Sequence, residues 1–209
     1  MTAILSDLDG VLVDSRASIM RAWRWWGAGH GIEERTVAAV EHGRPSREII
    51  AGLVPQLDAA AESTAIDRRQ AQDTADVIAL PGAAELLGGG HEPLAIVTSC
   101  TVPLATARLR AAGLPVPRVL VTPERLRRGK PDPEGYLLAA RELGIAPADC
   151  VVLEDAPAGA AAGQAAGMQV VGITTTLSAG ELSADEHAPS VAAWLHRALS
   201  GASRPAPRR

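Results

Sequence analysis

The sequence is poor in aromatic residues, and this limits how its core can be built. It contains no Phe, one Tyr and four Trp in 209 residues. The interior must therefore be filled mainly with Ala, Val, Leu and Ile, whose small side chains allow helices to pack closely. The hydrophobic fraction of 47% and the charged fraction of 21% are nevertheless typical of an ordinary globular protein.

A net positive charge, metal-binding cysteine spacing and membrane-targeting segments are also missing. The net charge is −4, so no general attraction to nucleic acid is expected. Cys100 and Cys150 have no metal-ligand spacing and are expected to be plain thiols in a reducing cytoplasm. Asp7 and Asp9 interrupt the first apolar stretch, so we expect neither a signal peptide nor a membrane span. We therefore predict a cytoplasmic protein that is a monomer or a weak homodimer.

Five short apolar runs are typical of strands that are buried on both faces of a parallel sheet. They cover residues 2–5, 94–97, 118–121, 150–153 and 169–173. Helical patterns alternate with the later runs, over residues 103–112, 132–143, 156–166 and 190–199. This alternation predicts an α/β fold with a doubly wound, Rossmann-like parallel sheet.

The stretch between the first two apolar runs is too long for a simple crossover. It is helix-like throughout, with separate patterns over residues 16–27, 33–41, 46–51 and 59–77. We predict a small all-helical cap at residues 15–80, inserted after the first strand of an α/β core formed by residues 1–14 and 81–200. Residues 201–209 are basic and Pro-rich, and they are expected to form a disordered tail.

Two acidic pairs follow apolar runs at the ends of predicted strands. Asp7 and Asp9 follow the first run, and strand alternation turns both to one side of the chain. Glu154 and Asp155 follow the run at 150–153. An isolated Asp-x-Asp is more often a solvated strand end. If the two strands are neighbours, however, the carboxylates converge where α/β sheets bind ligands, in an oxygen-rich site suited to Mg²⁺ rather than zinc.

Three further polar residues follow in positions that suit phosphate. Thr98 and Ser99 come directly after the second strand, where hydroxyls and backbone N–H groups can hold phosphate oxygens, although such residues often only cap helices. Lys130 lies in a loop and would ordinarily be solvated. In the same cleft it would offset carboxylate and phosphate charge.

Four segments in this order resemble the haloacid dehalogenase superfamily of phosphotransferases. They are DLDGVLVDS at 7–15, IVTS at 96–99, GKP at 129–131 and VLEDAPAG at 152–159. The helical insert also matches the position of that family's α-helical cap. One departure is Ser6, which stands where the family usually has Phe before the nucleophile.

The resemblance implies a role for each core residue. Asp7 would attack phosphorus to form an aspartyl-phosphate, and Asp9 would protonate the leaving oxygen and later take a proton from water. Thr98 and Lys130 would bind the transferring phosphoryl oxygens. Mg²⁺ would be held by the Asp7 carboxylate, the Asp9 backbone carbonyl and the Asp155 carboxylate, with Glu154 assisting.

The cap is expected to set the substrate, because it closes over the leaving group. The segments at 21–26 and 41–48 resemble bacterial sugar-phosphatases and glycerol-phosphatases. His42, Arg44 and Arg47 are candidate substrate ligands, with helix capping or surface ion pairs as the alternative. Trp23 and Trp26 share a helix face and fit a cap core better than a sugar platform. We predict a phosphatase acting on a small phosphorylated metabolite, a sugar or polyol phosphate.

Three alternatives remain. A β-phosphoglucomutase-like enzyme would share the catalytic residues, but that branch has a His on the first cap helix where this chain has Ile19. A non-catalytic phosphate-binding regulatory domain would be expected to lack Asp7, Asp9 or Lys130, and all three are present. A receiver-type signalling domain pairs acids with a Lys on such a sheet, but it has no large cap.

Overall fold

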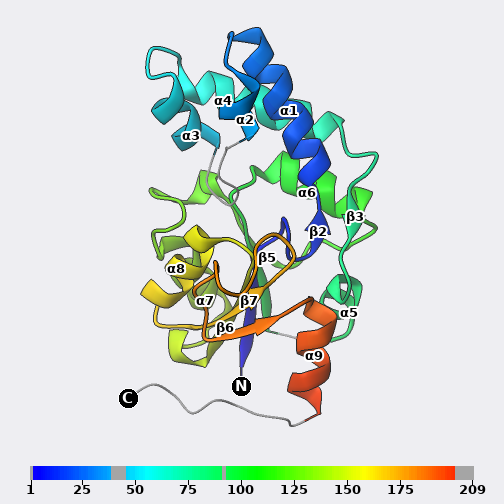
Figure 1. The fold of residues 1–209 in the computed structure, drawn as a ribbon. Coiled ribbons are helices and arrows are strands. Elements are labelled where there is room, and N and C mark those ends of the chain that lie inside the picture. The colour runs from blue at the N-terminus through cyan, green and yellow to red at the C-terminus, as the bar shows by residue number, and fades with distance from the viewer. Residues whose placement is uncertain (1, 39–45, 91–92, 201–209) are drawn as a thin grey trace.

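A six-stranded parallel sheet forms the centre of the molecule in the computed structural model, which describes residues 2–38, 46–90 and 93–200 (Figure 1). Its order is β5 (Val119–Val121), β4 (Leu94–Val97), β1 (Ala3–Ser6), β6 (Cys150–Glu154), β7 (Gln169–Ile173) and β8 (Glu186–Ala188). All five predicted strands are present within a residue or two of the expected bounds. The sixth, β8, was missed because Glu186–Ala188 is a short edge strand with no apolar run.

Helices cover both faces of this sheet, which confirms the doubly wound α/β fold. One apolar cluster packs α5 (Ala83–Gly88), α6 (Val102–Ala111) and α9 (Val191–Leu199) on one face. A second packs α7 (Glu134–Leu143) and α8 (Pro157–Ala165) on the other. Strand residues alternate between them: in β4, Ile96 belongs to the first cluster and Val97 to the second. Small residues allow the close packing, as at Gly163, where an added Cβ would lie 2.8 Å from the Val170 side chain.

The described helices between β2 (Val13–Asp14) and β3 (Ile78–Ala79) form a separate group with its own small core. They are α1 (Arg16–Gly29), α2 (Glu34–Ala38), α3 (Ser46–Leu53) and α4 (Ala59–Gln72), and they lie beyond one end of the sheet (Figure 1). Their buried side chains include Trp23 and Trp26, whose rings meet edge to face at 5.5 Å. Both Trp residues therefore belong to the core of the helical group.

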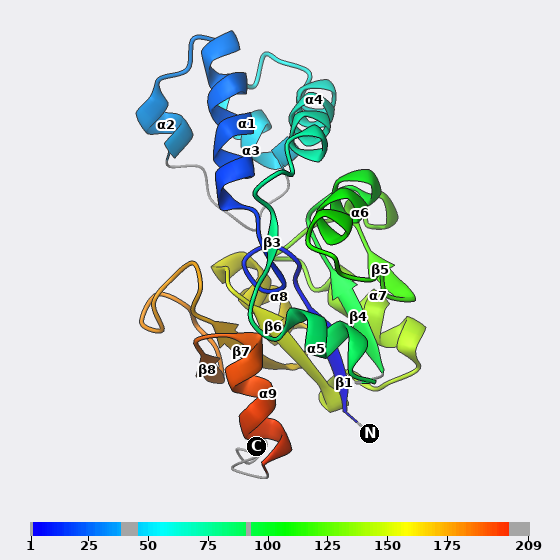
Figure 2. The same cartoon turned by 90° about the vertical axis from the view of Figure 1, so that its right-hand side faces the viewer.

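A two-stranded ribbon joins this helical group to the sheet. The antiparallel pair is β2 (Val13–Asp14) and β3 (Ile78–Ala79), and Figure 2 shows the chain entering and leaving the helical group there. The helix expected over 59–77 is wrong at its end, because α4 stops at Gln72 and Arg21 binds Asp73 and Asp76 beyond it. Across the described residues, no helix is long and apolar enough to cross a lipid bilayer.

Candidate active site

Three carboxylates meet where β1 and β6 end side by side. The strands pair in parallel with Ser6 opposite Leu153, so Asp7 and the Glu154–Asp155 pair leave the sheet at the same edge. Ligand oxygens of Asp7, Glu154 and Asp155 lie within 4.8 Å of one another, and all three residues are buried. The two strands are therefore neighbours, which is the condition on which the convergence of the carboxylates depended.

Lys130 is buried against this cluster. Its Nζ lies 2.7 Å from Asp7 Oδ1 and 2.6 Å from Glu154 Oε1, and the Tyr136 hydroxyl donates to Glu154 at 2.7 Å. Lys130 thus pairs with two of the three carboxylates. Burial raises the pKa of Asp7 to about 7, although Lys130 opposes the rise, and burial also raises the pKa of Asp155. A divalent cation would relieve this excess charge, and an all-oxygen set suits a hard ion such as Mg²⁺.

Two glycines allow the close approach of backbone and carboxylate. Gly10 has a left-handed φ of +76°, and an added Cβ there would lie 1.9 Å from Asp155 Oδ2. At Gly159, on α8, an added Cβ would lie 1.7 Å from Glu154 Oε1. Thr176 donates a hydrogen bond to Asp155 from the loop after β7. The positions of Glu154 and Asp155, at the end of β6, therefore depend on groups from three separate segments.

The side chain of Asp9 lies apart from the acidic cluster. Its Oδ1 accepts from Ser15 Oγ at 2.5 Å, and its Oδ2 accepts from the Cys100 thiol at 2.9 Å and from Arg108 Nη1 at 2.5 Å. The carboxylate of Asp9 is therefore paired with a cation of the core, while Asp7 is paired with Lys130. The two acids have separate environments, as two groups with different chemical tasks require.

Thr98 and Ser99 lie on the same side of the sheet, after β4. Thr98 is buried, and its hydroxyl oxygen accepts the backbone N–H of Cys100 at 3.1 Å. Ser6, at the position where the family usually has Phe, is buried and donates its hydroxyl to the carbonyl of Asp7 at 2.6 Å. A small polar side chain therefore fills the space directly behind Asp7.

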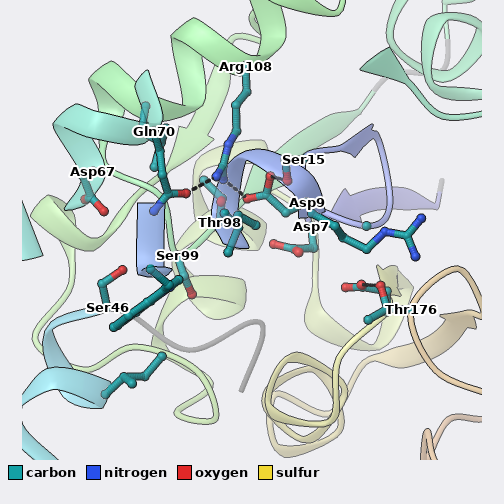
Figure 3. A pocket seen from close by; sticks show the side chains of 17 residues that line it. Asp7, Asp9, Ser15, Ser46, Asp67, Gln70, Thr98, Ser99, Arg108 and Thr176 are labelled. Atoms are coloured by element: carbon teal, nitrogen blue, oxygen red, sulfur yellow. Dashed lines mark hydrogen bonds and ion pairs between the residues drawn. The ribbon is translucent and has the colours of Figure 1, made fainter. Parts of the chain in front are cut away.

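A cavity of about 80 Å³ lies between the sheet edge and the helical group (Figure 3). The core contributes its acidic and hydroxyl groups, and the helices contribute a mixed apolar and polar wall. The lining includes Asp7, Asp9, Thr98, Ser99, Arg108, Asp155 and Thr176 from the core, and Ile19, Trp23, Ser46, Ile49, Asp67 and Gln70 from the helical group. The structure therefore brings Asp7, Asp9, Thr98, Ser99 and Asp155 to one cavity.

Of the three predicted cap ligands, the structure describes Arg47. Arg47 is exposed and borders a second hollow of about 320 Å³, which adjoins the first because both are lined by Ser46, Asp67 and Ser99. His42 and Arg44 lie outside the described residues. Arg47 is therefore beside the cavity that contains Asp7 and not on its wall.

Sequence reasoning missed several cavity residues, and Arg108 is the clearest example. The buried face of α6 consists of Leu104, Ala105, Arg108 and Leu109. An arginine on the apolar face of a core helix is a signal that it has a buried acidic partner. Gln70, Asp67 and Thr176 carry no such signal, because isolated polar residues in a cap helix or a loop are ordinary.

Comparisons with known proteins agree with this geometry. Residues 1–167 match the family model described as haloacid dehalogenase-like hydrolase. The chain is 47% identical over 176 residues to hexitol phosphatase A of Escherichia coli, and the match covers 81% of each protein. It is 36% identical over 185 residues to validoxylamine A 7'-phosphate phosphatase of Streptomyces hygroscopicus, and this match covers 82% of this chain and 85% of that one. The crystal structure of a hydrolase from Pseudomonas syringae superimposes with a TM-score of 0.85 at 26% identity, covering 97% of this chain and all of that one.

The family match spans Asp7, the helical group and the acidic pair at the end of β6. The relatives match over most of their own length as well as most of this chain. This chain therefore belongs to the haloacid dehalogenase-like hydrolase family, as one of its phosphatases.

Proposed function

We propose that this protein is a magnesium-dependent phosphatase that hydrolyses a sugar or polyol phosphate through an aspartyl-phosphate on Asp7. The observation that carries the proposal is the buried Asp7 carboxylate. It lies 2.7 Å from Lys130 Nζ and lines the cavity between the sheet and the helical group. A cation beside this carboxylate favours the anion that attacks phosphorus. The 15–80 cap and the 1–14 with 81–200 core remain our proposed division of the chain.

The reaction has two steps. In the first, a carboxylate oxygen of Asp7 forms a bond to phosphorus as the ester oxygen leaves and takes a proton from Asp9. In the second, water attacks the phosphorus of the acyl phosphate, its proton passes to Asp9, and the Asp7 oxygen is released. Asp9 is restored to its starting state after each turnover. Lys130 and Thr98 hold the phosphoryl oxygens during both steps.

The metal site in this proposal consists of the carboxylates of Asp7 and Asp155, assisted by Glu154, and the backbone carbonyl of Asp9. When bound, Mg²⁺ supplies positive charge that lets an anionic nucleophile approach an anionic phosphate. The support is the excess of three buried carboxylates over one lysine at this edge of the sheet. Glu154 also accepts from Lys130 and Tyr136, so it holds both the lysine and the metal site in place.

A hexitol phosphate is the substrate that the cavity and the similarity to hexitol phosphatase A favour together. The helical wall offers Ser46 and Asp67 as partners for hydroxyl groups, between the apolar side chains of Ile19 and Trp23. Arg47, at the adjoining hollow, remains a candidate ligand for the far end of a longer substrate. Alternating polar and apolar contacts suit a chain of hydroxyl-bearing carbons.

A β-phosphoglucomutase-like activity is the second candidate. The two activities share Asp7 and Asp9 and differ in whether water or a sugar hydroxyl takes the phosphoryl group. Ile19 lines the cavity at the position where that branch has a His, so this wall offers an apolar side chain and no imidazole. This favours hydrolysis. A cytoplasmic location and a monomer or weak homodimer remain predictions.

The test is a panel of phosphate esters, including hexitol phosphates, glycerol phosphate and β-glucose 1-phosphate, assayed with Mg²⁺ and with excess EDTA. Both free phosphate and isomerised sugar phosphate are measured. We expect phosphate release that EDTA abolishes and Mg²⁺ restores, highest with a hexitol phosphate. Glucose 6-phosphate as the main product from β-glucose 1-phosphate would favour the mutase. Equal hydrolysis by wild type and Asp7→Asn would overturn the covalent mechanism.

A further inference from the structure

One buried guanidinium connects Asp9 to the helical group. Arg108 lies on the core helix α6 and is 1% exposed. Its Nη1 donates to Asp9 Oδ2 at 2.5 Å, and its Nη2 donates to the side-chain oxygen of Gln70 on α4. Figure 3 shows the Arg108 side chain reaching between Gln70 and Asp9, with both bonds drawn. One planar group therefore spans from the core acid to the cap.

Arg108 is the charged partner that holds the Asp9 side chain in position. Among the described residues, Arg108 is the one cationic side chain paired with Asp9; Ser15 and Cys100 supply the other bonds. A guanidinium stays charged when buried and donates from a rigid fork, so it fixes both distance and direction. Arg108 Nε finds no partner in the described chain, so the cost of burying this charge is offset mainly through the two terminal nitrogens.

The bond to Gln70 makes the orientation of Arg108 depend on the position of the cap. It is 3% exposed and comes from the last turn of α4, whereas Arg108 and Asp9 both belong to the core. Movement of α4 away from α6 would break the Arg108–Gln70 bond and open the cavity to water. The guanidinium would then keep only its core partners, Asp9 and Cys100, and would lose the bond that fixes Nη2.

We propose that Arg108 is a positioning residue that aims the Asp9 side chain for proton transfer, and that Gln70 makes this orientation depend on a closed cap. The inference rests on the proposed function, in which Asp9 protonates the leaving oxygen. Arg108 acts through Asp9 and makes no contact with the ester in this scheme. The consequence is specific: poor leaving groups, which need the proton, depend on Arg108, and good leaving groups do not.

The test compares kcat/KM for a hexitol phosphate with kcat/KM for p-nitrophenyl phosphate, because this ratio reports the step in which the ester bond breaks. An alkoxide leaving group needs a proton, whereas p-nitrophenolate is stable without one. For Arg108→Met we expect a loss of roughly 10- to 100-fold with the hexitol ester, within the range of general acid catalysis. The aryl ester should lose less than about threefold by the same reasoning. A burst of p-nitrophenolate is also expected, since hydrolysis of the aspartyl-phosphate still needs Asp9.

Gln70→Leu should give the same pattern with a smaller loss. The double variant should be no worse than Arg108→Met alone, because Gln70 acts through Arg108. Arg110→Met and Gln72→Leu are matched controls on the same helices, where both side chains are exposed. Both controls should behave as wild type with either ester.

Equal losses with both esters would overturn the inference, because they would mark Arg108 as a structural or phosphate-binding residue. Additive losses in the double variant would overturn the coupling to Gln70. If Arg108→Met fails to fold, Arg108→Lys retains the charge without the fork and should still affect the hexitol ester more than the aryl ester. Asp9→Asn is the reference: if it spares the hexitol ester, the proposed function fails. If Asp9→Asn is selective and the Arg108 variants are not, only this inference fails.

Discussion

Two walls of the cavity are built in opposite ways. One is the carboxyl end of the central strands β1 and β6, called the sheet edge below, and the other is the cap wall. At the edge, Asp7, Lys130 and Glu154 are buried polar groups that bond mainly to one another. In the cap, the buried groups are mostly apolar, such as Trp26 and Ile66, and the wall facing the cavity mixes polar with apolar side chains. The edge is therefore held by charge and the cap by hydrophobic packing.

We infer from this difference that the sheet edge carries out the reaction and that the cap selects the substrate. A buried charge that loses its partner is strongly destabilising, so the groups at the edge have little freedom to move. An apolar core of a few side chains tolerates changes at the residues around it more easily. The cap wall can therefore differ between related enzymes while the sheet edge keeps one arrangement. If this view is right, substitutions at the edge should affect every substrate, and substitutions in the cap should depend on the substrate.

The largest effect is expected from Asp7→Asn. The variant keeps the side-chain shape but removes the nucleophilic carboxylate, so turnover of every ester in the panel should fall by roughly 10⁴-fold or more. The measurement is steady-state phosphate release with thermal melting to check the fold. Asp149→Asn, at an exposed carboxyl just before β6, is the matched control and should keep full activity. Substrate-dependent losses in Asp7→Asn would break the comparison at its strongest point.

A second change acts on the sheet edge without replacing a charged residue. In Gly159→Ala the new Cβ would fall 1.7 Å from Glu154 Oε1, so Glu154 must move away from Lys130 and Tyr136. We expect Mg²⁺ affinity to fall by about 10- to 100-fold, as for other losses of supporting contacts around a metal site. Titration of activity with Mg²⁺ measures this.

The matched control for this change is Gly88→Ala. Gly88 also lies in a core helix, and an added Cβ there meets nothing within 4 Å. The control should require the same Mg²⁺ concentration as wild type. An equal Mg²⁺ requirement for Gly159→Ala would show that Glu154 can move without loss, and the edge would then be less rigid than we infer.

Much of the sheet edge could be predicted from the sequence because its signals are local. Buried parallel strands give uninterrupted apolar runs, and each is followed at once by the residues that leave the sheet at its carboxyl end. Asp7 and Glu154 were therefore placed by counting from β1 and β6. The strand that was missed, Glu186–Ala188, is an outermost strand of the sheet and has no such run.

The cap wall was harder to predict because its cavity residues come from turns of helices that are distant in sequence. Gln70 meets Arg108 across 38 residues, and neither belongs to a recognised motif. Helical periodicity predicted the buried face of α1 with Trp23 and Trp26, since that face repeats every three to four residues. It could not predict where α4 lies against α6, because that depends on packing between two separate apolar cores.

The cap core gives a third way to test the comparison. Trp26 is 1% exposed and its indole N–H donates to Glu62 at 2.7 Å, so Trp26→Ala should destabilise the cap by about 3–5 kcal/mol. Hydrogen exchange should show faster opening of α1 and α4 with little change in β1 and β6. We expect a smaller loss of kcat/KM than for Gly159→Ala, with an unchanged Mg²⁺ requirement.

Trp25→Ala is the control for this substitution. Trp25 is the neighbouring residue on α1 and is 49% exposed, so its removal should leave exchange in the cap near that of wild type. Faster exchange in β1 and β6 in the Trp26 variant would contradict the view that the two cores are separate. The cap would then contribute directly to the rigidity of the sheet edge.

The smallest expected effect concerns a single cap carboxyl. Burial raises the pKa of Asp67 from its ordinary value of 3.8 to about 6, although a hydrogen bond from Thr101 and the charge of Arg108 oppose the rise. Because the pKa in the folded protein is above that in the unfolded chain, protonated Asp67 adds stability below pH 3.8, and this contribution is lost as the pH rises through about 6. Asp67→Asn cannot ionise, so its stability relative to wild type should increase between pH 4 and pH 7, by at most about 3 kcal/mol. Urea unfolding at several pH values measures the difference, with Asp149→Asn as the exposed control. A difference that does not change with pH would mean that Asp67 is well solvated, and the cap wall would then be more open to water than the sheet edge beneath it.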